Sequence, residues 1–177
     1  VIHYRAHFVR RLRETAPAIH ADFSGGRERL DLRYATVSAV TDPEAPAREI
    51  LPQLLEHMAA HRQAELDARQ CLSGPHKDDL TVELDGADAK TYASQGQTRT
   101  AALSLKLGCR EIFFHDAGEW PVLLLDDVLS ELDRRRQEFV LNRIGGGQVF
   151  ITCCEDERLE NLKEGAVFHI HGGALVG

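Results

Sequence analysis

The sequence Pro-Val-Leu-Leu-Leu-Asp-Asp-Val-Leu-Ser-Glu-Leu-Asp, residues 121–133, decides the fold class. A short apolar run of this kind is typical of a β-strand that is buried on both faces in the middle of a parallel sheet. Asp126 and Asp127 would then lie at the carboxyl end of that strand, where open α/β sheets bind their ligands. The short connections that follow predict parallel pairing within an α/β layer. The expected elements are a strand at 122–126, a helix at 133–144 and a strand at 148–152.

Two adjacent aspartates at the end of a buried strand need a physical explanation, because each carboxylate raises the cost of ionising the other. A bound Mg²⁺ would relieve the repulsion, since this ion prefers one or two carboxylates together with water and phosphate oxygens. One interpretation is a Walker B site in which Asp126 holds Mg²⁺ and Asp127 positions or deprotonates an attacking water. The alternative is a loop that caps the next helix, because Ser130 and Asp133 fit a capping box.

A second polar motif, Ser-Gln-Gly-Gln at 94–97, opens a helix expected over about 98–108. Backbone amides at a helix N-terminus bind anions, and a glycine allows the backbone to approach them closely. Ser94 and Gln97 add neutral hydrogen-bond donors, so the loop could hold a phosphate without a lysine. The alternative is an ordinary polar turn in which Ser94 serves only as the N-cap.

The rest of the chain predicts mixed helices and hairpins. Apolar periodicity and Gly or Pro breaks give a helix at 1–21, a strand at 30–37 and a helix at 47–70. An Asp-Gly turn predicts a hairpin, with strands at 80–86 and 89–93. A last hairpin is expected within 167–176.

Composition limits the class of protein. The chain has 177 residues, 43% of them hydrophobic, and a formal net charge of −7, which argues against coating nucleic acid by bulk charge. No apolar run approaches the roughly 18 to 20 residues of a membrane span. The four cysteines show no CxxC spacing, which favours free thiols in a reducing, cytoplasmic setting. The chain begins with Val1 rather than Met, so we expect part of a longer protein.

Four motifs in this order resemble the RecF family, bacterial recombination-mediator ATPases related to ABC and SMC proteins. They are SGPHKDDL at 73–80, ASQGQTRTAALSLKL at 93–107, PVLLLDDVLSELD at 121–133 and QVFIT at 148–152. The resemblance implies an α/β fold, the carboxyl-terminal half of an ABC-type P-loop NTPase lobe at 73–177. A partly helical arm would precede it at 1–72.

The resemblance also implies site residues. One group would form the ABC-type signature loop, which contacts the γ-phosphate of ATP on the other subunit: Ser94, Gln95, Gly96 and Gln97. Asp126 would be the Walker B metal ligand, and Asp127 would take the catalytic place that a glutamate holds in most ABC proteins. Ser130 to Asp133 would be the D-loop, which crosses the dimer interface.

The implied function is ATP-dependent DNA binding at gapped or single-strand/double-strand junctions, in recombinational repair, the SOS response and replication restart. ATP and Mg²⁺ would be the cofactors. The partners would be single-stranded and junction DNA, mediator proteins of the RecO and RecR type, and a second copy in an ATP-dependent homodimer, with no membrane involved. Three residues depart from the family pattern: Lys77 stands where arginine is usual, and Cys153 and Cys154 stand where threonines are usual.

One motif is missing. No GxxxxGK[ST] occurs in the sequence, and this P-loop supplies the phosphate cradle and its lysine. We therefore expect that this chain alone hydrolyses no ATP, whereas the longer protein would do so slowly as a dimer. Two alternatives stay open: another ABC-type ATPase, such as an SMC-like or transporter subunit, and a non-catalytic interaction module.

The remaining candidates favour structural roles. His57 and His61, and likewise His169 and His171, have spacings that metal ligands use, but neither pair has a third ligand at a suitable offset. His76 is expected to be a buried, hydrogen-bonded structural residue. Two arginine clusters could contact a phosphate backbone but are more typical of solvated helix faces. They are Arg10, Arg11 and Arg13, and Arg134, Arg135 and Arg136.

Overall fold

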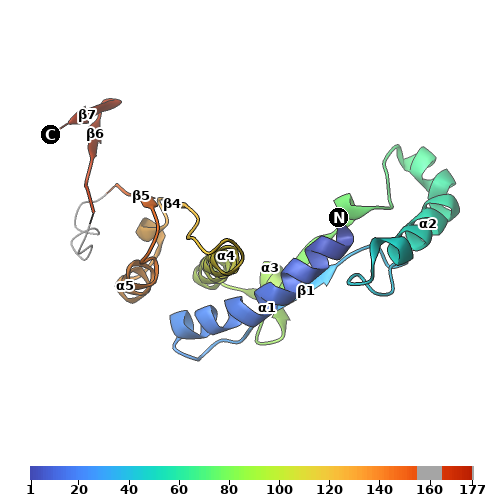
Figure 1. The fold of residues 1–177 in the computed structure, drawn as a ribbon, viewed down its shortest axis with the longest axis horizontal. Coiled ribbons are helices and arrows are strands. Elements are labelled where there is room, and N and C mark those ends of the chain that lie inside the picture. Colours follow the sequence, from blue (N-terminus) through green and yellow to red (C-terminus); the bar gives the residue numbers. More distant parts are fainter. Residues whose placement is uncertain (155–164, 177) are drawn as a thin grey trace. The chain divides into compact units, whose positions relative to one another are not determined.

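The structure, a computed structural model, describes residues 1–154 and 165–176. The chain divides into two compact units, Val1–Glu119 and Trp120–Gly177 (Figure 1). Residues 73–119 therefore pack in the same unit as residues 1–72. The expected division of the family fold at 72/73 stays a prediction.

The first unit combines helices with a small antiparallel sheet (Figure 1). Its elements are α1 (Ile2–Ser24), β1 (Leu30–Ala35), α2 (Ala47–Ala68), η1 (Pro75–Lys77), β2 (Asp79–Leu84), β3 (Ala87–Asp88), α3 (Ala89–Tyr92) and α4 (Gln95–Ala117). The sheet order is β1-β2-β3, with Leu30 opposite Leu84 in the first pair. Strand β1 is thus joined to a partner about fifty residues later in the sequence.

The core of this unit lies where α1, α4 and the sheet meet. Leu12, Ala16, Leu32 and Ala101 are among its buried members. Helix α4 approaches α1 closely at Gly108, because a Cβ there would lie 3.0 Å from Leu12 Cδ1. The close fit fixes α4, and with it the polar loop at its N-terminus.

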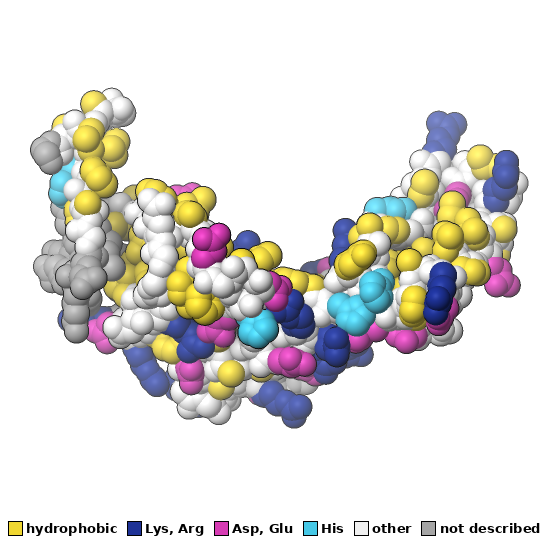
Figure 2. Space-filling model, in the orientation of Figure 1, with side chains coloured by type: hydrophobic (Ala, Val, Ile, Leu, Met, Phe, Trp, Pro, Cys, Tyr) yellow, Lys and Arg dark blue, Asp and Glu magenta, His cyan; other side chains and the backbone are white. Residues whose placement is uncertain are grey.

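Helix α2 differs from α1 and α4 because only Ile50 on it is buried. Hydrophobic side chains gather on its outer surface (Figure 2). The large exposed ones are Leu51, Leu55, Met58 and Leu66. No described helix is both long enough and apolar enough to cross a membrane.

The second unit contains the expected strand-helix-strand segment. Its elements are β4 (Leu123–Asp126), η2 (Leu129–Glu131), α5 (Arg134–Arg143), β5 (Val149–Thr152), β6 (His169–His171) and β7 (Ala174–Val176). Strands β4 and β5 are parallel, as predicted, and β6 and β7 form the predicted hairpin. The parallel register places Asp126 beside Thr152.

The prediction that 122–126 is buried on both faces is wrong. Leu125 is 5% exposed, whereas the neighbouring Leu124 is 70% exposed. Successive side chains on a strand point to opposite faces, and Leu123 and Leu125 lie on the face opposite that of Leu124. In this unit only one face of β4 is therefore covered.

Two other element boundaries differ from the expectation. The return strand predicted at 89–93 is only Ala87–Asp88, and Asp88 then caps the short helix α3 by accepting from Lys90 N. The helix predicted over 98–108 runs from Gln95 to Ala117. It ends at Gly118, whose positive φ of 75° suits a glycine C-cap.

Candidate functional site

The Ser94–Gln97 loop forms the N-terminus of α4. Ser94 is the N-cap, and its hydroxyl oxygen accepts from Gln97 N at 3.3 Å. Gln97 Oε1 accepts in return from Ser94 N at 2.9 Å, which completes a capping box. The two interpretations of this loop, a helix cap and a phosphate-binding loop, are therefore compatible. The loop caps the helix, and it leaves Ser94 and Gln95 exposed to solvent.

The cap leaves part of the first turn available to a ligand. Within the described part of the chain, the backbone amides of Gln95 and Gly96 have no recorded acceptor. Unpaired amides at the start of a 23-residue helix carry partial positive charge and favour an anion. The Ser94 hydroxyl accepts from Gln97 N, so its own proton can still be donated. This loop therefore offers three neutral donors to a phosphate.

Asp126 and Asp127 lie at the carboxyl end of β4, as predicted. Asp126 Oδ1 accepts a hydrogen bond of 2.5 Å from the Thr152 hydroxyl on β5. Asp127 N donates to Thr152 Oγ1 at 3.0 Å, and Asp127 adopts a positive φ of 50°, which is uncommon for a residue other than glycine. Thr152 thus fixes both aspartates relative to the strand end.

The expected capping box of Ser130 and Asp133 is wrong. The N-cap of α5 is Asp133, which accepts from Arg136 N at 3.0 Å, while Ser130 donates to Asp127 O at 2.7 Å. The physical reason is that η2 includes Ser130, so the cap of α5 lies three residues later, at Asp133. Ser130 therefore stabilises the turn at Asp127, and Asp133 stabilises the helix.

The donor set at the end of β4 fits Mg²⁺. Both aspartates are exposed, and the adjacent side-chain donor, Thr152, is also an oxygen. Hard oxygen ligands are those that Mg²⁺ prefers, and it keeps several waters rather than a full protein cage. The described residues contain no group of three or more His, Cys, Asp or Glu side chains that could hold a metal ion. Asp126 would therefore bind a partly hydrated ion.

The histidines singled out in the sequence differ in their contacts and in their exposure. The rings of His57 and His61 stack 4.0 Å apart, and His57 Nδ1 lies 2.6 Å from Ser73 Oγ. His76 Nε2 lies 3.1 Å from Cys71 O, but the residue is exposed, so the expected burial is wrong. His169 and His171 are both exposed on β6.

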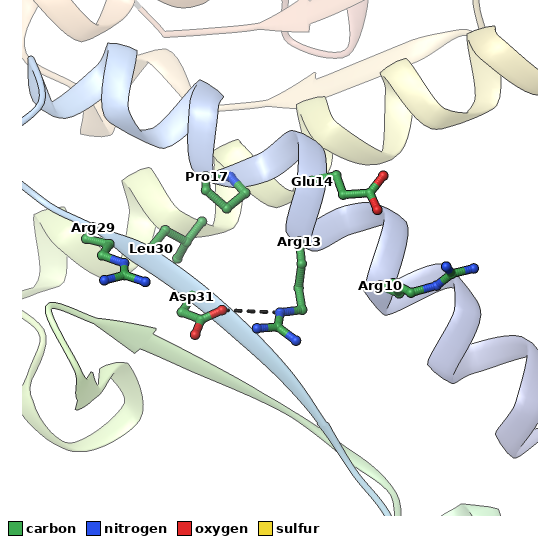
Figure 3. Close-up of a pocket in the computed structure, with 7 residues that line it drawn as sticks. All are labelled: Arg10, Arg13, Glu14, Pro17, Arg29, Leu30 and Asp31. Atoms are coloured by element: carbon green, nitrogen blue, oxygen red, sulfur yellow. Dashed lines mark hydrogen bonds and ion pairs between the residues drawn. The ribbon is translucent and has the colours of Figure 1, made fainter. Parts of the chain in front are cut away.

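The first arginine cluster is a solvated, ion-paired helix face. Arg10 pairs with Glu44, and Arg11 pairs with Asp116 at 2.7 Å, which raises the pKa of the arginine and lowers that of the aspartate. Arg13 lies 3.3 Å from Asp31 in a shallow pocket of about 430 Å³ between α1 and β1 (Figure 3). In the second cluster, Arg134 pairs with Glu138 and Arg136 with Asp133.

Asp78, in the SGPHKDDL motif, is a structural residue that the sequence did not single out. Its side chain is fully buried and accepts from Tyr34, from Thr36 at 2.6 Å and from Arg5 at 3.1 Å. Burial and the hydrogen bond to Asp78 raise the pKa of Tyr34 to about 12. The motif is therefore anchored to α1 and β1.

The same motif is anchored to α2. Glu65 accepts from the backbone amides of Leu72 and Ser73, and these two bonds lower the pKa of its carboxyl. Lys77, the departure from the family pattern, is exposed.

The predicted site residues fall into two groups. Ser94, Gln95, Gly96 and Gln97 lie in the first unit, and Asp126, Asp127, Ser130 and Asp133 lie in the second. Sequence reasoning missed Thr152, although its place opposite Asp126 follows from the register of two parallel strands. Cys153 and Cys154 follow it as free thiols, the second of them exposed.

Comparison with known proteins gives a consistent result. The chain is 42% identical over 178 residues to the DNA replication and repair protein RecF of Lysinibacillus sphaericus, and 41% identical over 179 residues to that of Bacillus subtilis. Each match covers 99% of this chain and 48% of the relative. A search against family models found no match.

Two solved structures share this fold. They are of the recombination mediator protein RecF in the RecFOR pathway, designated RecF-ATPrS and RecF-ATP. Their TM-scores are 0.81 and 0.80 at 31% identity, over 98% of this chain and 45% of theirs.

The chain belongs to the RecF family. It corresponds to a carboxyl-terminal part of RecF and spans about half the length of the curated relatives it matches. The mixed α/β fold is that of RecF, an ABC-type ATPase, as the sequence predicted. This RecF-family chain retains the order of motifs that led to the prediction, from the SGPHKDDL segment to the strand that ends at Thr152.

Proposed function

We propose that this RecF-family chain supplies the signature loop, the metal aspartate and the D-loop of an ATP-dependent, DNA-binding homodimer. Ser94, Gln95, Gly96 and Gln97 form the loop that closes on ATP bound to the other subunit. The observation that carries the proposal is the N-terminus of α4, where the Ser94 hydroxyl and the amides of Gln95 and Gly96 are available to a phosphate. The family membership and the two RecF structures named for ATP and its analogue support it.

The second unit contributes the other half of the chemistry. Asp126, oriented by Thr152, holds Mg²⁺, which when bound offsets the negative charge of the phosphates. Asp127 positions or deprotonates the attacking water, and Ser130 keeps its backbone in the left-handed turn. Asp133, in the D-loop, contacts the partner subunit. The P-loop and its lysine come from an amino-terminal lobe of the kind found in ABC-type ATPases.

Family membership supports the biological role proposed here. The dimer binds single-stranded and junction DNA, and hydrolysis releases it. It acts in DNA replication and repair, with the SOS response and replication restart as specific settings. Mediator proteins of the RecO and RecR type are the partners, which agrees with the RecFOR pathway named for the two solved structures.

The test is ATP-dependent dimerisation, measured by light scattering, of this chain joined to a P-loop-bearing amino-terminal lobe. Ser94→Arg places a bulky cation where the phosphate is expected, so we expect ATP-driven dimers to be lost. Ser38→Arg is the matched control, because Ser38 is exposed in the turn after β1 and far along the chain from the loop. If dimers persist in Ser94→Arg, the signature loop does not hold the neighbour's nucleotide.

A further inference from the structure

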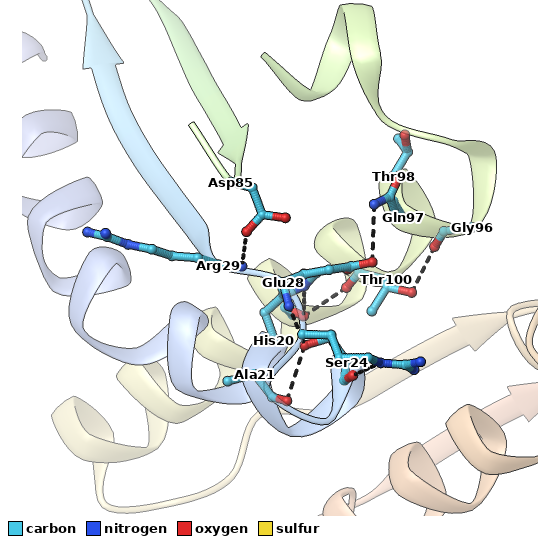
Figure 4. Close-up of polar contacts among 12 residues, drawn as sticks. His20, Ala21, Ser24, Glu28, Arg29, Asp85, Gly96, Gln97, Thr98 and Thr100 are labelled. Carbon is cyan, nitrogen blue, oxygen red and sulfur yellow. Dashed lines mark hydrogen bonds and ion pairs between the residues drawn. The ribbon is translucent and has the colours of Figure 1, made fainter. Parts of the chain in front are cut away.

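A buried polar network lies behind the loop at the start of α4 (Figure 4). Both ends of the Gln97 amide are used: Oε1 accepts from Ser94 N, and Nε2 donates to Glu28 Oε1 at 3.1 Å. Glu28 lies between α1 and β1, 69 residues earlier in the chain. Gln97 therefore connects the loop to a distant segment through both ends of its amide.

The network continues into the protein from Glu28. Its second oxygen, Oε2, lies 3.1 Å from Nε2 of His20, which is fully buried on α1. His20 Nδ1 lies 3.3 Å from Ser104 Oγ, and Ser104 donates to Thr100 O at 2.8 Å. The contacts start at Gln97 and return to α4 two turns later, so Glu28 and His20 brace the first turns of that helix.

We propose that Glu28, supported by His20, is a positioning residue for the signature loop and that Gln97 is a structural link rather than a phosphate ligand. The proposal rests on the proposed function for its consequence, because the loop it positions is the one that holds the nucleotide. With Gln97 held in this way, Ser94 and Gln95 stay exposed at the start of the helix.

The geometry predicts which substitutions break the link. In Gln97→Glu a carboxylate replaces the donor that lies 3.1 Å from Glu28, and two anions at that distance repel each other. Glu28→Gln alone changes less, because its amide oxygen still accepts from Gln97. The double variant, Glu28→Gln with Gln97→Glu, exchanges the two groups and restores one donor and one acceptor. A capping box accepts Glu as readily as Gln at this position.

The first measurement is amide hydrogen exchange at Ser94, Gln97 and Thr98, whose amides donate hydrogen bonds within the cap, in the chain itself and without nucleotide. We expect Gln97→Glu to speed exchange about tenfold and the double variant to return it to within about threefold of the parent, since directly contacting residues couple strongly. Glu14→Gln is the control, because it also removes a carboxylate, but at an exposed position on α1. If Gln97→Glu does not fold, Gln97→Met removes both polar ends and is expected to raise exchange in the same way.

The second measurement is ATP-dependent dimerisation of the same variants joined to a P-loop lobe. We expect a loss of about tenfold in dimer affinity for Gln97→Glu and recovery in the double variant. If Ser94→Arg abolishes dimers but the double variant dimerises no better than Gln97→Glu, the positioning role is overturned and the proposed function survives. If Ser94→Arg has no effect, the proposed function fails, while hydrogen exchange still decides whether Glu28 holds the loop.

Discussion

At the scale of single residues, the side chains around the site are placed by partners far away in sequence. Asp78 receives hydrogen bonds from three elements or loops, and Glu28 links α4 to the end of α1. Thr152 joins two strand ends through a single hydroxyl. The chemistry assigned to the exposed residues therefore depends on side chains outside the Ser94–Gln97 loop and the aspartate pair.

Tyr34 gives a prediction at this scale. Its raised pKa means that the folded state favours the neutral phenol, so the stabilisation is complete below pH 10 and is lost as the pH rises towards about 12. Tyr34→Phe removes a hydrogen bond to a buried carboxylate and is expected to cost about 1.5 to 3 kcal/mol at neutral pH. The difference in unfolding free energy between parent and variant should shrink between pH 10 and 12.

The measurement is urea denaturation at pH 7, 10 and 11.5. Tyr92→Phe serves as the control, because Tyr92 is 75% exposed. If the difference in unfolding free energy between parent and Tyr34→Phe stays constant across these pH values, the pKa of Tyr34 is not raised in the folded state.

The candidate site could be predicted from sequence only in part, for a reason visible at Gln97. The SQGQ pattern correctly indicated that a helix opens here with Ser94 as a possible N-cap, although the helix begins at Gln95 rather than about residue 98. It could not show that Gln97 faces Glu28, because no spacing rule connects residue 97 with residue 28. Thr152 was also missed: the two strands and their parallel pairing were predicted, but the register that places Thr152 beside Asp126 comes from the structure.

At the scale of elements, the glycine turn before β5 sets the shape of the second unit. Gly146 and Gly147 have positive φ, and a Cβ on Gly147 would lie 2.5 Å from Trp120 Cβ. A side chain there faces both backbone strain and a clash. Only glycine lets the chain turn so close to the start of the unit.

Substitution at this turn gives the second prediction. Gly147→Ala is expected to destabilise the second unit by about 2 kcal/mol or more, from the left-handed backbone and the overlap with Trp120. Gly145→Ala is a matched control, because a Cβ at Gly145 meets nothing within 4 Å. Trp120 is the single tryptophan, so its fluorescence follows unfolding of this unit directly. Equal midpoints for the two variants would contradict the assigned clash.

Most elements were predictable because glycine and proline mark their ends, and the errors have identifiable causes. Helix α4 was predicted to end at residue 108. Gly108 instead lies inside the helix, where it packs against Leu12, and the C-cap is Gly118. The strand expected at 89–93 became a helix because Asp88 provides a cap. The exposure of Leu124 could not be foreseen, since an apolar run does not state which neighbours the strand has.

At the scale of the whole molecule, the chain carries residues of two proposed nucleotide sites. It has the paired aspartates for one site and the proposed signature loop for the site of a partner, but no GxxxxGK[ST] sequence. It also matches 48% of the length of its RecF relatives. A complete site would need the phosphate cradle from an amino-terminal lobe and the signature loop from a second subunit.

This division predicts that the chain alone shows no Mg²⁺-dependent ATP turnover above background. Joined to a P-loop lobe, it should hydrolyse ATP slowly, and Asp127→Asn should lower that rate by at least about a hundredfold, as expected for loss of a catalytic base. Phosphate release at a range of chain concentrations is the measurement. If the isolated chain hydrolyses ATP, and its Asp126→Asn variant does so equally well, residues other than Asp126 carry out the reaction.

The capping box and the Glu28 contact have a further consequence for the thermodynamics of association. Gln97 is already immobilised before any nucleotide arrives, so the entropic cost of ordering the loop is met during folding rather than during binding. Calorimetry of ATP-driven assembly should then show a smaller unfavourable entropy for the parent than for Gln97→Met. In the variant, the same loop would have to become ordered at the moment of contact.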